Sequence, residues 1–188
     1  SCTTCQVIKT VPHQRKVPLH NWEPANVFQR LHCDHFGPIK SPVGSKVKAK
    51  DEYKYVLVLV DALSLNMELV PAKTTSAEET ANLIFTEWIC RYGCPEFVVS
   101  DRGTAFCSAL SDAFFRRCGI KHLKTSPRHP CSNSKVEQQN RLIIRALRAT
   151  CNDGQSWVEK LPLIAMSHPA GVITTLGTSP YRILYGFD

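Results

Sequence analysis

An amphipathic segment at residues 77–92 divides the chain into two groups of strand-like segments and most constrains its fold. Its apolar residues recur at helical spacing and form one stripe, which comprises Ala77, Ala81, Ile84, Phe85, Trp88, Ile89 and Tyr92. A capping box at Ser76 with Glu79, or at the pair one residue earlier, marks the start, and Gly93 marks the end. We therefore predict one long helix that packs its stripe against a sheet.

Five segments have the β-branched and aromatic composition of strands, and a second helical segment lies between the last two. The strand candidates are 30–36, 53–60 and 67–70 before the long helix, and 96–100 and 121–125 after it. Short connections between the first three predict antiparallel pairing, whereas helical crossovers, through 77–92 and 109–118, predict parallel pairing of the last two. The expected fold is α/β: a five-stranded mixed sheet, three antiparallel and then two parallel strands, flanked by helices. This is the ribonuclease-H-like layout.

The remaining segments flank this sheet. Residues 1–29, with spaced prolines and no hydrophobic period, read as a linker, so the predicted folded core is 30–188. Residues 44–52 read as a basic hairpin loop, for which a solvated turn is the simpler interpretation. Two further helices are expected at 135–150 and 157–168, with Pro162 in the first turn of the second.

Charge and cysteine content narrow the function classes. The net charge of +7 suits an anionic partner, either nucleic acid or a membrane surface. The apolar run Tyr55–Val60 is far too short to cross a bilayer. Nine cysteines at irregular spacing do not resemble a secreted disulfide framework, so reduced thiols in an intracellular compartment are expected.

Three acidic residues are candidate ligands, although each alone has an ordinary structural explanation. Asp34 could be a strand-end residue, Asp101 a turn former, and Glu137 the acidic member of a helix cap with Ser134. In the predicted topology, however, the first and fourth strands are neighbours, and the helix after them brings Glu137 to the same edge. Three converging carboxylates require cations, and two Mg²⁺ ions suit such oxygen ligands and phosphoryl transfer.

The spacing and wording around these residues resemble a known family. Thirty-five residues separate Asp101 from Glu137, as in the D,D-35-E retroviral and retrotransposon integrases. The matching segments are His32-Cys-Asp34-His-Phe-Gly37, Val60-Asp61, Ser100-Asp101-Arg-Gly-Thr-Ala-Phe106, Thr125-Ser-Pro-Arg-His-Pro130, Asn133-Ser-Lys-Val-Glu137-Gln-Gln-Asn140, Trp157-Val-Glu-Lys-Leu-Pro-Leu163 and Thr178-Ser-Pro-Tyr-Arg-Ile-Leu-Tyr-Gly186. The last two segments are similar to those of gypsy-type and foamy-virus integrase cores. Gln138 stands where the family usually has Arg, which removes one positive charge beside the site.

The resemblance implies a nuclear enzyme that processes the 3′ ends of retroelement DNA and joins them to target DNA. Asp34, Asp101 and Glu137 would be catalytic and would hold two Mg²⁺ or Mn²⁺ ions. Lys135, Arg141 and Asn133 would contact double-stranded DNA. The resemblance also implies a homo-oligomer, at least a dimer of the core, and an origin within a larger polyprotein.

Cys2 and Cys5 resemble the end of the family's amino-terminal His-His-Cys-Cys zinc module. A CxxC pair is half of a tetrahedral zinc site. The His ligands would lie upstream, so Zn²⁺ is expected only in a longer chain.

Two other function classes remain open from the sequence. A host-adopted relic would bind DNA or protein without catalysis and would bind no Mg²⁺ or Mn²⁺. A ribonuclease-H-type nuclease would cleave RNA in hybrids, but that class usually has a fourth acidic residue, and the 35-residue spacing does not suit it.

Overall fold

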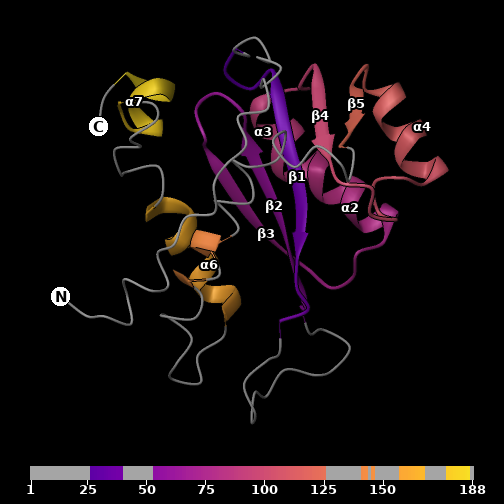
Figure 1. Ribbon diagram of the computed structural model, residues 1–188, viewed down its shortest axis with the longest axis horizontal. Helices are drawn as coiled ribbons and strands as arrows, with labels where there is room; N and C mark the ends of the chain where they lie inside the picture. Colours follow the sequence, from indigo (N-terminus) through magenta and orange to yellow (C-terminus); the bar gives the residue numbers. More distant parts are fainter. Residues whose placement is uncertain are drawn as a thin grey trace, which may run out of the picture.

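The computed structural model describes residues 26–39, 53–125, 141–143, 145–146, 157–167 and 177–186. Within them lies one five-stranded sheet (Figure 1). The strands are β1 (Arg30–Phe36), β2 (Tyr55–Asp61), β3 (Met67–Ala72), β4 (Phe97–Ser100) and β5 (Lys121–Lys124). Their order is β3-β2-β1-β4-β5, with β1 in the centre. The β1–β2 and β2–β3 pairs are antiparallel, and the β1–β4 and β4–β5 pairs are parallel, which confirms the predicted mixed sheet.

The long helix forms as predicted but contains a π-helical turn. It consists of α2 (Ala77–Ile84), η2 (Phe85–Ile89) and α3 (Cys90–Tyr92) in direct succession. Ile84 and Trp88 are fully buried, as the stripe predicts, but Phe85 is 44% exposed. Phe85 is the first residue of the π-helical turn, whose i→i+5 hydrogen bonds interrupt the α-helical spacing on which the predicted stripe depends. The prediction that Phe85 packs in the core is therefore wrong.

The start of α2 resolves the two capping alternatives. Ser76 is the N-cap, and its Oγ accepts a hydrogen bond from the Glu79 backbone N–H at 3.2 Å. The Glu79 carboxylate accepts from the backbone N–H groups of Lys73 and Thr74, at 2.8 and 2.9 Å. Partial burial acts to raise the pKa of Glu79, but hydrogen bonds from the Thr74 hydroxyl and these N–H groups outweigh it and lower the pKa. Glu79 thus ties the loop after β3 to the helix.

Three more helices with defined bounds lie in the described part of the chain: α4 (Ala109–Arg117), α6 (Trp157–Ser167) and α7 (Pro180–Tyr185). Pro162 lies inside α6 rather than in its first turn, so that placement is wrong. The sequence reading missed α7. Its signals are nonetheless clear, because Ser179 caps the Arg182 N–H, Pro180 occupies the first turn and Gly186 adopts the left-handed conformation at the end.

Two hydrophobic clusters cover the two faces of the sheet. One cluster joins the β1 residues Leu31 and Cys33 to the helices on the α2 and α4 side. The other joins Val58 on β2 to Ile143 and to α6, which lies across the sheet from α2 and α4 in Figure 1. The sheet is therefore the middle layer, and each strand residue can be assigned to one face.

Several predicted segments lie outside the described residues: 1–25, the basic loop at 44–52 in full and most of 135–150. In the described part of that last segment, residues 141–143 and 145–146 are helical. No helix among the described residues is long and apolar enough to span a membrane.

Candidate functional site

Asp34 lies on β1, the central strand of the sheet, and Asp101 directly follows β4, the parallel neighbour of β1. Cys33 on β1 pairs with Ser100 on β4, and each aspartate is the next residue along its chain. Neighbouring strands lie about 4.8 Å apart, so the two backbones bring these carboxylates into one region. Asp34 also pairs with Val58, whose side chain belongs to the cluster on the α6 side, so Asp34 projects from that face.

The turn after β4 fixes the exposed Asp101 carboxylate. Its Oδ1 accepts a hydrogen bond from the backbone N–H of Gly103 at 2.8 Å. A Cβ on Gly103 would lie only 2.9 Å from the same Oδ1 atom, so a side chain there would displace the carboxylate. The close contact with Asp101 therefore explains why glycine occupies position 103 in the Asp-Arg-Gly-Thr sequence.

His35 supports this region from the opposite face. Its Nε2 lies 3.2 Å from Thr80 Oγ1, and its ring lies 5.2 Å from the ring of Phe106, in the loop after β4. Burial lowers the pKa of His35, and the negative charges of Asp101 and Glu79 partly offset that effect. No role for His35 was predicted from the sequence.

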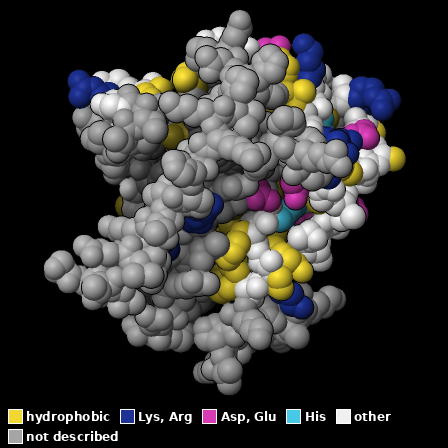
Figure 2. All heavy atoms as spheres, viewed as in Figure 1, with side chains coloured by type: hydrophobic (Ala, Val, Ile, Leu, Met, Phe, Trp, Pro, Cys, Tyr) yellow, Lys and Arg dark blue, Asp and Glu magenta, His cyan; other side chains and the backbone are white. Residues whose placement is uncertain are grey.

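Near the centre of the face in Figure 2, acidic side chains lie beside a histidine.

The helical residues 141–143 and 145–146 lie on the side of the sheet from which Asp34 projects. Ile143 is fully buried and packs in the same cluster as Val58. Arg141 and Arg145 are exposed. In these residues the helix thus has a buried side at Ile143 and an exposed side with arginines.

The other predicted site residues, Glu137, Lys135, Asn133, Cys2 and Cys5, lie outside the described residues. Within the described ranges, no group of three or more His, Cys, Asp or Glu side chains is arranged to hold a metal ion. Asp34 and Asp101 supply two carboxylates, a donor type that Mg²⁺ prefers. A third carboxylate would have to come from the undescribed part of the chain.

Comparisons with known proteins point to one family. No protein-family model matches the chain. It is 34% identical to the Pol polyprotein of feline endogenous virus ECE1 over 135 residues, 71% of this chain and 13% of that protein. It is 26% identical to the Pro-Pol polyprotein of simian foamy virus type 3 over 188 residues, 100% of this chain and 16% of that protein. The chain thus spans a small part of these relatives.

Solved structures agree in fold. The HTLV-2 integrase catalytic core domain in complex with magnesium superposes with a TM-score of 0.65 and 20% identity, covering 86% of this chain and 99% of that one. The simian T-cell lymphotropic virus intasome in complex with PP2A regulatory subunit B56 gamma gives 0.75 and 19%, covering 98% of this chain and 63% of that one. The chain is related to retroviral Pol polyproteins and has the integrase-core fold. These comparisons confirm the resemblance to integrases that was inferred from the sequence.

Proposed function

We propose that the chain is the catalytic core of an integrase, a polynucleotidyl transferase that processes the 3′ ends of retroelement DNA and joins them to target DNA. The observation that carries this proposal is the position of Asp34 and Asp101, one residue beyond the paired Cys33 and Ser100 on parallel strands. Glu137 would be the third acidic residue of the site.

The site would bind divalent cations through these three carboxylates. Two Mg²⁺ or Mn²⁺ ions, when bound, would supply the positive charge that stabilises a transferring phosphate. The sheet fixes the backbone beneath both aspartates, and the Gly103 N–H fixes the Asp101 carboxylate, so little reorganisation of Asp101 would be needed on binding. Cleavage would use water as nucleophile, and joining would use the freed 3′-OH at the same site.

DNA would lie across the exposed arginines Arg141 and Arg145. Arg141 is four residues after Glu137 and is exposed, so it can bind a phosphate close to the acidic residues. Lys135 and Asn133 are proposed as further DNA contacts. The HTLV-2 core has been solved in dimeric form, which supports our proposal of a homo-oligomer.

The flanking assignments stay proposals. We propose that 1–29 is a linker that carries the end of a zinc module, with Zn²⁺ bound at Cys2 and Cys5 only in a longer chain. An integrating enzyme acts where its target DNA is, so we propose a nuclear location for the active form.

Strand transfer measured with short blunt DNA ends and Mn²⁺ tests the proposal. The wild-type chain should produce DNA joined to a second duplex, and Glu137→Gln and Asp101→Asn should abolish the product. The matched control is Glu96→Gln. Glu96 is also acidic and exposed, but it lies just before the first residue of β4, whereas Asp101 lies just after the last. Strand transfer retained by Glu137→Gln would contradict the proposal.

Calorimetric titration with MnCl₂ tests the metal site independently of activity. Wild type should bind Mn²⁺, and Asp101→Asn should bind it far more weakly. A wild-type chain that binds no Mn²⁺ would favour the alternative of a host-adopted binding module without catalysis.

A further inference from the structure

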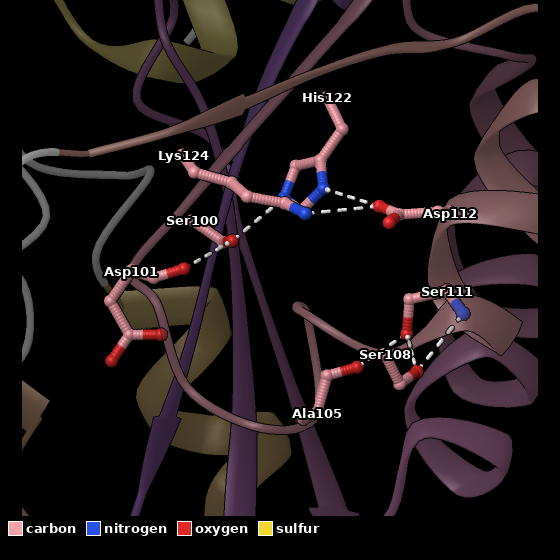
Figure 3. A network of polar contacts seen from close by, with 8 residues as sticks. All are labelled: Ser100, Asp101, Ala105, Ser108, Ser111, Asp112, His122 and Lys124. Atoms are coloured by element: carbon pink, nitrogen blue, oxygen red, sulfur yellow. Dashed lines mark hydrogen bonds and ion pairs between the residues drawn. The ribbon is translucent and has the colours of Figure 1, made fainter.

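A buried hydrogen-bond chain reaches Asp101 from the α4 side of the sheet. Ser100 is fully buried, and its Oγ donates to the main-chain oxygen of Asp101 at 2.8 Å. The same Oγ lies 2.8 Å from Nε2 of His122 on β5 (Figure 3). A hydroxyl has one hydrogen to donate, so the His122 Nε2 must carry the hydrogen of the second bond. His122 thus donates to Ser100, which donates to the Asp101 backbone.

His122 is held in a fixed position. It pairs with Val98 across the β4–β5 ladder, its side chain is only 7% exposed, and its ring lies 4.7 Å from that of Phe115. Burial and the positive charge of Lys124 lower its pKa, while Asp112 acts in the opposite direction. A neutral imidazole with one N–H agrees with the donor assignment at Nε2.

The second ring nitrogen of His122 is left without a hydrogen-bond partner among the described residues. Its Nδ1 is buried and lies 4.0 Å from Asp112 Oδ1, beyond hydrogen-bond distance, while that carboxylate pairs with Lys124 at 3.1 Å. A buried unpaired nitrogen is destabilising. The ring orientation therefore makes the hydrogen bond from Nε2 to Ser100 and leaves Nδ1 without one.

The chain of bonds acts on Asp101 from the side opposite to its carboxylate. In Figure 3 the carboxylate of Asp101 points away from Ser100 and His122. The backbone at this point is also fixed laterally, because the Thr125 N–H donates to the Ser100 main-chain oxygen at 2.9 Å. With the Gly103 N–H on the carboxylate itself, the end of β4 is held from three directions.

We propose that His122 is a positioning residue for Asp101, acting through Ser100 to fix the backbone from which the carboxylate reaches the cations. The inference rests on the proposed function, since it takes Asp101 as a metal ligand. Neither His122 nor Ser100 carries a carboxylate, and the two residues are 22 positions apart in the sequence. Outer partners that orient metal ligands typically affect metal affinity by about 10- to 100-fold.

Two substitutions at His122 separate hydrogen bonding from packing. His122→Phe keeps a ring against Phe115 and removes the donor, whereas His122→Gln loses the ring and keeps an N–H near the Nε2 position. In a MnCl₂ titration, His122→Phe should weaken binding by about 10-fold or more, and His122→Gln should stay within about 3-fold of wild type. The opposite order, with normal affinity in His122→Phe, would overturn the proposal.

Ser100→Ala provides a second variant that removes the link with little change in volume. It should weaken Mn²⁺ binding as His122→Phe does, and the double variant should show no further loss, because both break one chain of bonds. Additive losses would show that His122 acts by another route and would overturn the proposal. Thermal unfolding without metal identifies any variant whose loss of Mn²⁺ affinity reflects misfolding. If His122→Phe is such a variant, the affinity of Ser100→Ala decides whether the positioning role is correct.

Failure of this inference can be told apart from failure of the proposed function. If wild type binds Mn²⁺, Asp101→Asn does not, and both His122→Phe and Ser100→Ala bind normally, only the positioning role is wrong. If wild type itself binds no Mn²⁺, the metal site and the positioning role both fail.

Discussion

Cys33 and Ser100 pair across the central parallel strands, and this pair determines where the two aspartates lie. Both paired residues are buried, and Asp34 and Asp101 are the residues that directly follow them along the chain. The paired core residues thus place Asp34 and Asp101 in one region. A cation bound by both carboxylates would be held only in the folded chain, where the strands bring the two residues together.

Metal binding should therefore stabilise the fold. At Mn²⁺ concentrations near 100 times Kd, ligand linkage contributes about 2.7 kcal/mol. For a chain of this size that corresponds to a rise of roughly 5–10 °C in Tm. Differential scanning calorimetry should show the rise in wild type and Glu96→Gln, and little or none in Asp34→Asn or Asp101→Asn. An equal rise in all four proteins would place the binding site elsewhere.

Cys33 should be unreactive in the native protein, whereas Cys107 should react. Complete burial raises the pKa of the Cys33 thiol, and the nearby negative charge of Asp34 adds to this effect, while Cys107 is exposed. Iodoacetamide labelling followed by peptide mass spectrometry should give labelling of Cys33 at least about tenfold slower than of Cys107. Equal rates would contradict the β1 register, which directs Cys33 into the core and Asp34 outward. Labelling in urea provides the control.

Sequence periodicity was sufficient for the order and pairing of the strands, because alternation and helical crossovers depend on local pattern. It did not reveal the π turn that exposes Phe85, because that turn depends on how the helix fits the sheet. Pro162 was misplaced for a similar reason, since tertiary packing can accommodate proline inside a helix.

The candidate site was predictable only in part. Asp34 and Asp101 could be paired from topology, because parallel strands end at a common edge. The Ser100–His122 contact could not, because it depends on the parallel register of β4 and β5 and on side-chain rotamers. Nothing in the local sequence of His122 distinguishes it from an ordinary strand residue.

Asp61 should be essential for stability but not for metal binding. It is fully buried, and its carboxylate accepts from the Phe28 N–H at 2.9 Å and from the Ser64 N–H and hydroxyl at 2.7 Å each. Asp61→Ala leaves these donors unpaired, at about 1–3 kcal/mol for each buried group. We expect urea unfolding to show a loss of about 2–5 kcal/mol. Glu87→Ala, which breaks only a surface pair with Arg91, should change stability by less than about 0.5 kcal/mol.

Stability should fall as the pH drops below about 6.5, the usual pKa of an unfolded histidine. His122 has a lowered pKa in the folded chain, so the unfolded state takes up its proton first and is favoured by acid. The neighbours that face it are Lys124, which lowers the pKa, Asp112, which raises it, and the neutral Ser100.

Urea unfolding measured between about pH 5 and pH 7.5 checks this sign. His122→Gln should reduce the slope of stability against pH by at most about 1.4 kcal/mol per pH unit. The remaining slope would include His35, whose pKa is also lowered by burial. A steeper slope in His122→Gln would mean that the histidine is stabilised in its charged form in the folded chain.

Arg141 should contribute to DNA affinity without setting sequence preference. It is exposed on the helix whose buried residue Ile143 packs on the face from which Asp34 projects, so a phosphate can reach it from solvent. Each phosphate contact contributes about 0.9 to the slope of log affinity against log salt. In fluorescence anisotropy with duplex DNA, Arg141→Ala should reduce that slope by about 1 and weaken binding for every sequence alike. The matched control is Arg116→Ala, which should leave the slope unchanged. Arg116 is an exposed arginine on α4, on the other side of the sheet. Equal effects of the two substitutions would mean that DNA is held by overall charge rather than by a site that includes Arg141.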